Sequence, residues 1–170
     1  MELKQKLAKV GISLPEIMLP GKGADPQKWA VIACDQFSSE PEYWKGVSDF
    51  VGDAPSTLNL IFPECYLEDG DGEERIKNIN ATMKTYLEQD ILASMGDSFI
   101  LTRRTTPDSP ERWGLITALD LEAYDFTSGS KSLIRATEGT ILDRIPPRKE
   151  IRKDALLEFP HIMVLLNDPE

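Results

Sequence analysis

The segment spanning residues 73–89 constrains the fold more than any other part of the sequence. Its apolar residues recur at steps of three and four, while charged residues fill most of the positions between them. This spacing predicts a helix with Ile76, Ile79, Met83 and Leu87 on one face. Because such a helix is stable in water only when that face is buried, the chain must supply a second apolar surface. We expect that surface to be a β-sheet.

Short runs of β-forming residues supply candidate strands for this sheet. They cover residues 29–33, 57–62, 133–136 and 161–166, and the turn-rich stretch inside 98–118 predicts a β-hairpin. Helical and strand patterns mix along the chain without a repeat or a low-complexity linker. We therefore expect an α+β (mixed α/β) fold in a single domain over residues 1–170, with a central mixed sheet flanked by helices.

Two shorter helices are expected near the N-terminus. Leu3, Leu7 and Val10 have helical spacing before Gly11, and a second helix is predicted from Ser38 or Ser39 to about residue 52. The proline-containing stretch 14–27 between them favours an extended tether.

The charge of the chain argues against several classes of partner. With 19 basic and 29 acidic residues the formal net charge is -10, which disfavours nonspecific binding to nucleic acid. No apolar run is long enough to span a membrane or to form the core of a secretory signal, so we expect a cytoplasmic protein without a membrane partner. Cys34, Cys65 and His161 lack the spacing of a zinc site. Both cysteines are expected to be buried or weakly reactive thiols, and a disulfide between them is the alternative.

One segment reverses this acidic balance. Residues 131–153 contain seven basic and three acidic side chains, and they include a Thr-Glu-Gly-Thr loop. Thr137, Gly139 and Thr140 of this loop are candidate phosphate-binding residues, together with Arg144 and Arg148. The loop lacks the sequence of a P-loop or a dinucleotide fingerprint, and the plainer alternative is a surface turn with arginines in ordinary ion pairs.

Two carboxylates are the candidate catalytic residues. Asp35 follows the predicted strand 29–33, and Glu138 lies in the glycine-containing loop. Either one has the chemistry of an acid/base or of a magnesium ligand, and the plainer alternative for Asp35 is an ordinary acid at a helix entry. A ligand site requires these groups to converge, so we expect the loop to lie near Asp35 and near Arg144 or Arg148.

Several segments together resemble a known family. They are WAVIACDQFSSEPEYW, PSTLNLIFPECYLED, INATMKTYL and KSLIRATEGTILDRIPPRKEIRKDALLEFPHIMVLLNDPE. In these segments the chain resembles the N-terminal part of the bacterial family called domain of unknown function 1015, sometimes labelled SpoOJ/ParB-like. The resemblance implies a ParB/sulfiredoxin-like fold and a longer protein whose C-terminal region would be a partner of this piece.

The wider ParB/sulfiredoxin group includes nucleotide-binding proteins and free-serine kinases, which the resemblance makes relevant here. We therefore expect a nucleotide- or phosphometabolite-binding domain, as part of a small-molecule kinase, with a phosphorylated small molecule as partner and magnesium and a nucleotide as cofactors. The alternative is a noncatalytic interaction or regulatory domain. Binding to nucleic acid is a third and weaker hypothesis, because the net charge of -10 opposes it.

Overall fold

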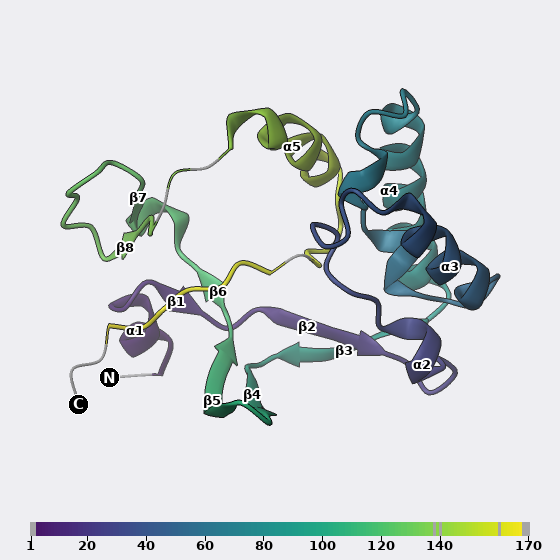
Figure 1. Cartoon of the computed structure of the whole chain (residues 1–170). Helices are drawn as coiled ribbons and strands as arrows, with labels where there is room; N and C mark the ends of the chain where they lie inside the picture. The colour runs from purple at the N-terminus through teal and green to yellow at the C-terminus, as the bar shows by residue number, and fades with distance from the viewer. Residues whose placement is uncertain (1–2, 138, 140, 160, 168–170) are drawn as a thin grey trace. The chain divides into compact units, whose positions relative to one another are not determined.

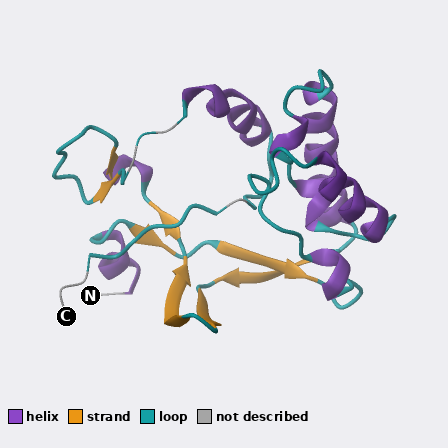
Figure 2. Ribbon diagram, in the orientation of Figure 1, coloured by secondary structure: helices purple, strands orange, loops and turns teal. Residues whose placement is uncertain are grey.

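The structure is a computed structural model that describes residues 3–137, 139, 141–159 and 161–167. The chain divides into two compact units (Figures 1 and 2). The first comprises Met1–Leu19 and Ser94–Thr140, and the second comprises Pro20–Ala93 and Ile141–Glu170. That these units form one domain over residues 1–170 stays a prediction.

The first unit consists mainly of short strands. It begins with helix α1, Leu3–Ala8, which ends before Gly11 as the sequence predicts. The other elements are β1 (Ile12–Ser13), most of β2 (Glu16–Pro20), most of β3 (Leu92–Asp97), β4 (Ile100–Thr106), β5 (Ser109–Ile116), β6 (Ala118–Leu119), η3 (Leu121–Ala123), β7 (Tyr124–Asp125) and β8 (Ile134–Arg135). Gly11 has a φ of 70°, a left-handed conformation that glycine adopts without strain, and it turns the chain from α1 into β1.

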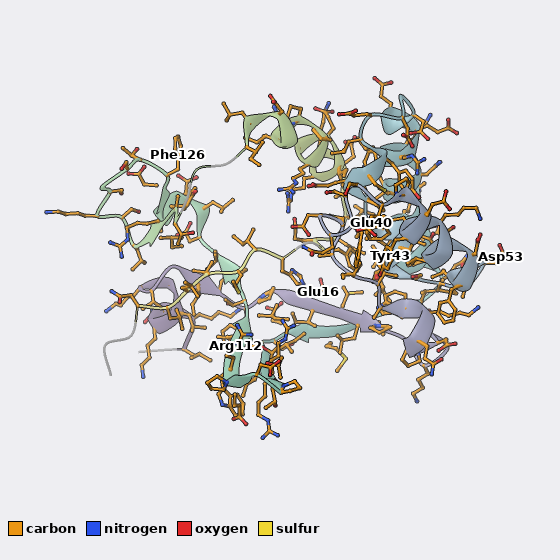
Figure 3. All side chains as sticks on the ribbon, in the orientation of Figure 1. Glu16, Glu40, Tyr43, Asp53, Arg112 and Phe126 are labelled. Atoms are coloured by element: carbon orange, nitrogen blue, oxygen red, sulfur yellow. The ribbon has the colours of Figure 1, made fainter. Side chains whose placement is uncertain are left out.

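The hairpin predicted within 98–118 is confirmed as β4 and β5. Its strands pair antiparallel, with Leu101 opposite Leu115 and Arg104 opposite Arg112. Both faces of this ribbon carry exposed side chains: Leu101 at 65% and Trp113 at 60% lie on one face, and the exposed Arg112, labelled in Figure 3, lies on the other. The hairpin therefore forms through its turn and its backbone ladder and buries few of its own side chains.

The second unit is built from helices and irregular segments. Its elements are α2 (Pro26–Trp29), α3 (Pro41–Val51), η1 (Thr57–Leu60), η2 (Glu64–Tyr66), α4 (Gly72–Glu88), η4 (Leu142–Arg144) and α5 (Ile145–Lys153). Helix α3 begins at Pro41, two residues after the predicted Ser39, and Gly52 ends it. The buried apolar residues of this unit are Trp29, Trp44, Val51, Leu60, Phe62, Ile79, Met83, Tyr86 and Leu92.

The long helix predicted over 73–89 is confirmed as α4. Ile79 is 5% exposed and Met83 is 2% exposed, while Ile76 and Leu87 are partly buried, so the predicted face is the buried one. The predicted packing of this face on a sheet was wrong, because in the described part of the chain α4 packs mainly against η1 and α5, and neither is a strand.

Three predicted strands are also wrong. Residues 29–33 begin at the end of α2, residues 57–62 form η1 and an extended tail, and residues 161–166 are not in a strand. Asp25 caps α2 by accepting a hydrogen bond from the backbone N–H of Gln27 at 3.0 Å, and Pro26 follows as its first residue. This start signal, inside the stretch that we expected to be a tether, makes residues 26–29 helical.

The α+β class is confirmed, but the sheets are small. The strands in the described part of the chain form four two-stranded sheets, of which the pair β7–β8 is parallel. The expected central sheet is therefore not present among them. The strand predicted over 133–136 is found as β8, over Ile134–Arg135. In the described residues, no helix is both long and apolar enough to cross a bilayer.

Candidate functional site

The second unit contains a pocket of about 590 Å³. Its walls come from residues 29–35, from the segment around η1 and η2, from Met83 of α4, and from α5 with the chain that follows it. Most of the lining side chains are apolar, including Val31, Ile61, Phe62, Met83, Ile151, Leu157, Phe159 and Ile162. The pocket is therefore suited to the hydrocarbon or aromatic part of a small molecule.

Two ion pairs lie among the residues that line this pocket. Arg148 donates a hydrogen bond from Nη2 to Oε1 of Glu64 at 2.5 Å. Arg152, one turn further along α5, holds Glu158 through two bonds of 2.9 and 2.5 Å. These pairs and the exposed carboxylate of Asp35 give a mainly apolar pocket charged groups of both signs.

Helix α5 positions both arginines. It begins at Ile145, so Pro146 and Pro147 fall in its first turn, where proline needs no hydrogen-bond partner for its nitrogen. Arg148 and Arg152 are four residues apart on this helix, which places them on one face, and both line the pocket.

The Cys34 thiol lies among these charged groups. The backbone N–H of Glu64 donates to the carbonyl of Cys34 at 2.8 Å, which fixes the start of η2 beside residue 34. Burial raises the pKa of the Cys34 thiol, and the charges of Asp35 and Glu64 raise it further. The thiol is therefore protonated at neutral pH and is a poor nucleophile.

The structure unites some of the predicted site residues. Asp35 and Arg148 line the same pocket, although they are far apart in the sequence. Thr137 and Gly139 are exposed in the first unit, while Glu138 and Thr140 lie outside the described residues. Arg144 lies in η4. The predicted convergence of the Thr-Glu-Gly-Thr loop with Asp35 stays a prediction.

Sequence reasoning missed Glu64 as a pocket residue. Its side chain is only 5% exposed, which is uncommon for a carboxylate. The available signal was its position directly after the apolar run LNLIFP, because a charged residue beside such a run lies close to buried side chains. Glu158 was missed as well, and its spacing from Arg152 gave no helical signal because it lies beyond the end of α5.

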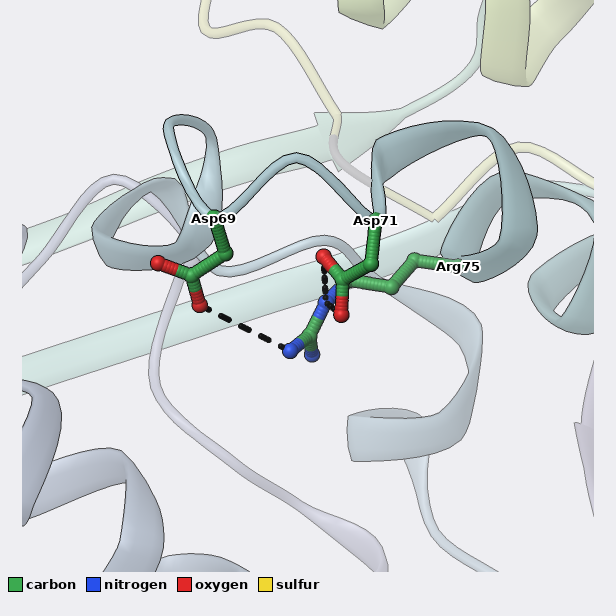
Figure 4. Close-up of polar contacts among 3 residues, drawn as sticks. All are labelled: Asp69, Asp71 and Arg75. Carbon is green, nitrogen blue, oxygen red and sulfur yellow. Dashed lines mark hydrogen bonds and ion pairs between the residues drawn. The ribbon is translucent and has the colours of Figure 1, made fainter.

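A second pocket of about 390 Å³ in the same unit includes Arg75. Arg75 Nε lies 2.8 Å from both carboxylate oxygens of Asp71, and its Nη2 lies 3.7 Å from Asp69 (Figure 4). The guanidinium also lies over the ring of Tyr66, 4.4 Å from its centre. Arg75 thus pairs with two carboxylates of the acidic turn before α4. Across the described residues, no group of three or more potential ligands is placed to hold a metal ion.

Comparisons with known proteins give one match. Residues 18–170 match the family described as protein of unknown function (DUF1015). Searches among curated proteins and among solved structures found no match. The matched range includes every residue of the pocket described above. The chain belongs to the DUF1015 family.

Proposed function

We propose that the second unit binds a phosphorylated small molecule, a nucleotide or a phosphometabolite, in the 590 Å³ pocket. The observation that carries the proposal is the position of Arg148 in a mainly apolar pocket, with 47% of its side chain exposed. Apolar walls would hold the body of the ligand, and a guanidinium would hold its phosphate.

Arg148 has the hydrogen-bonding capacity for this role. A guanidinium carries five N–H donors, and within the described residues Arg148 makes one hydrogen bond, from Nη2 to Glu64. The other donors can meet a phosphate without breaking that bond. Arg152 supplies a second positive charge to the same pocket, which strengthens the attraction for an anion.

The kinase form of the proposal assigns a role to Asp35. Phosphoryl transfer requires a magnesium ion and a group that orients the attacking hydroxyl. Asp35 lines the pocket and has the chemistry for either task. Under this proposal magnesium would strengthen the binding of a nucleotide, and an Asp35→Asn variant would lose that dependence.

The test is a thermal-shift screen with nucleotides, phosphorylated metabolites and magnesium, followed by calorimetry on any binder. A ligand at 100 times its Kd should stabilise the folded protein by about 2.7 kcal/mol. Arg148→Gln should weaken binding at least tenfold, since it removes a charged hydrogen bond to phosphate. Lys149→Gln is the matched control, because Lys149 lies on the same helix and does not line the pocket. Equal loss in both variants, or no binder at all, would contradict the proposal.

One observation favours the alternative of a noncatalytic interaction domain. Residues 162–166 are five consecutive apolar residues whose exposures run from 46% to 89%. An exposed run of this kind is typical of a surface that contacts another protein. Under this alternative the pocket would bind none of the screened molecules, and polyanion binding would survive deletion of residues 137–140.

A further inference from the structure

Two arginines form one cross-strand pair of the β4–β5 hairpin. Arg104 lies directly opposite Arg112 in the antiparallel register, and both side chains are exposed. The Cβ atoms of directly opposed residues lie about 5 Å apart, so the two guanidinium groups extend from neighbouring points on one face of the ribbon. Like charges in this arrangement repel each other and weaken the pairing of the strands. A bound anion would remove this repulsion.

The neighbouring Arg103 shows what these two arginines lack. Arg103 lies on the opposite face, where its Nε is 3.6 Å from Oε2 of Glu111 and its guanidinium lies 5.9 Å from the centre of the Trp113 ring. Within the described residues, the side chains of Arg104 and Arg112 make no ion pair and no hydrogen bond. Each guanidinium carries five N–H donors, so this face presents two positive charges whose donors are open to a ligand.

The adjacent cross-strand pair on the same face adds a hydroxyl. Thr102 lies opposite Gly114, and a Cβ atom at position 114 would be 2.7 Å from Oγ1 of Thr102. The hydroxyl therefore occupies the space that a side chain at position 114 would fill. It makes no hydrogen bond in the described part of the chain. Two guanidinium groups and one hydroxyl thus lie on adjacent pairs of the ladder, and each can donate to the oxygens of an anion.

The charge around this face does not oppose an anion. The first unit contains 8 basic and 9 acidic residues, whereas the second unit contains 11 basic and 20 acidic residues. Of the acids in the hairpin, Glu111 lies on the other face beside Arg103, and Asp108 lies in the turn. Interactions between exposed charges are largely screened beyond about 8 Å at physiological ionic strength, so distant acids have little effect on the arginine pair.

The arrangement selects among anions. Two adjacent positive charges match a dianion better than a monoanion, and a phosphate monoester carries about 1.5 to 2 negative charges at neutral pH. The exposed apolar residues Leu101, Trp113 and Leu115 lie on the other face of the ribbon. A membrane that received these apolar side chains would therefore lie on the side away from the arginines. The geometry favours a soluble phosphate monoester over a lipid headgroup.

We infer that the Arg104–Arg112 pair is an anion site that binds a soluble phosphate monoester. The phosphate lies between the two guanidinium groups, and the Thr102 hydroxyl donates a further hydrogen bond to it. The site belongs to the first unit and uses none of the residues of the 590 Å³ pocket. Because both arginines are exposed, binding here is weaker and more dependent on salt than in an enclosed pocket.

A matched pair of probes tests the site. We would titrate the full chain with methyl phosphate and with dimethyl phosphate at constant ionic strength, and follow the backbone amides of Thr102 and Gly114 by ¹⁵N NMR. Methyl phosphate should cause saturable shifts, while the methyl groups of Leu101 and Leu115 on the opposite face should not move. Dimethyl phosphate, a monoanion, should bind at least fivefold more weakly. Absence of saturable amide shifts would overturn the site, and equal affinities would overturn its assignment to a monoester.

Charge-removing variants then assign the binding to the arginine pair. Arg104→Gln and Arg112→Gln should each weaken the binding of methyl phosphate at least fivefold. Arg103→Gln is the matched control, because it removes the same charge from the opposite face of the same ribbon and should preserve the affinity. An equal loss in all three variants would reveal only a general effect of charge and would overturn the site. The positions are exposed, and the amide spectrum of the hairpin checks that each variant folds.

Two further measurements separate this site from other sources of phosphate binding. Vesicles that contain phosphatidic acid present a phosphate monoester on a lipid, and we expect no cosedimentation. Cosedimentation that is lost in Arg104→Gln would overturn the soluble source. Arg148→Gln, which alters the pocket of the second unit, should leave the shifts at Gly114 unchanged. Loss of those shifts in Arg148→Gln would overturn a separate site, so this inference and the proposed function can fail independently.

Discussion

The β4–β5 hairpin of the first unit and the pocket walls of the second unit are both made from β-forming sequence, yet only the hairpin forms strands. In the hairpin the backbone groups on the inner edge of each strand pair with the other strand, and the register runs from Ile100 opposite Ile116 to Thr106 opposite Ser109. The pocket walls at residues 29–35 and 57–62 have no such ladder. Instead, side chains from elsewhere in the unit form hydrogen bonds with some of the backbone groups of these pocket walls.

The hydrogen bonds around Trp29 and Ser56 account for this difference. The carbonyl of Trp29 accepts bonds from the hydroxyls of Ser56 and Thr57 at 3.3 and 2.8 Å. The Tyr86 hydroxyl accepts bonds from the Ser56 N–H at 3.0 Å and from the Asn59 amide at 3.1 Å. These long-range contacts hold an irregular backbone in place, and they show that burial among helices can outweigh a local preference for strands.

The largest expected effect comes from the core of the second unit. Ile79→Ala should lower the free energy of unfolding by about 2–5 kcal/mol, because it leaves a cavity under α4. Leu101→Ala in the hairpin is the control and should change it by less than about 0.5 kcal/mol, since Leu101 is 65% exposed. Urea unfolding of both variants gives the comparison, and similar losses would show that the two regions do not differ as described.

A smaller loss is expected from the hydrogen bonds that fix the pocket wall. Tyr86→Phe removes the acceptor of the Ser56 N–H, and Ser56 is 0% exposed. A buried donor left without a partner costs about 1–3 kcal/mol, to be measured by urea unfolding. Thr85→Val, at an exposed position on the same helix, is the control. An unchanged stability for Tyr86→Phe would contradict the role assigned to this hydroxyl.

The stability of the hairpin should depend on the close approach of its two strands at Gly114. A Cβ atom at Gly114 would lie 2.7 Å from Oγ1 of Thr102, so Gly114→Ala forces that side chain out of its rotamer. We expect a loss of about 0.5–1.5 kcal/mol. In a Thr102→Ala background the same change should become neutral or stabilising, because alanine restricts the unfolded chain more than glycine does. Thermal unfolding of the four proteins checks this, and a purely additive result would refute it.

The smallest effect concerns the acidic turn before α4. The hydrogen bond from Arg75 lowers the pKa of the Asp71 carboxyl below its usual range. The stabilisation that this hydrogen bond gives is therefore present above the pKa of an unfolded aspartate. It is lost as the pH falls through the lowered pKa of Asp71 in the folded protein. A ¹³C NMR titration should show the Asp71 midpoint rising toward the ordinary value in Arg75→Gln. An identical midpoint in both proteins would rule out Arg75 as the cause.

Local sequence predicted the parts of the fold that local interactions determine. The spacing of Ile79 and Met83 predicted α4, and the turn within 98–118 predicted the hairpin. The pocket depends on contacts between residues far apart in the chain, such as Arg148 with Glu64, which no spacing rule reveals. Asp35 and Arg148 were predicted as site residues from their chemistry, whereas Glu64 was recognisable only once its burial was known.

The most direct test of the account is methyl NMR during titration with the tightest phosphorylated ligand of the screen. We predict saturable shifts at Ile61 and Ile151, which line the pocket of the second unit, and no comparable shifts at Leu101 and Leu115 on the hairpin. The Arg148→Gln variant should require at least tenfold more ligand for the same shifts. Saturable shifts confined to the hairpin, or pocket shifts unaffected by Arg148→Gln, would contradict the central claim that this pocket binds phosphate through Arg148.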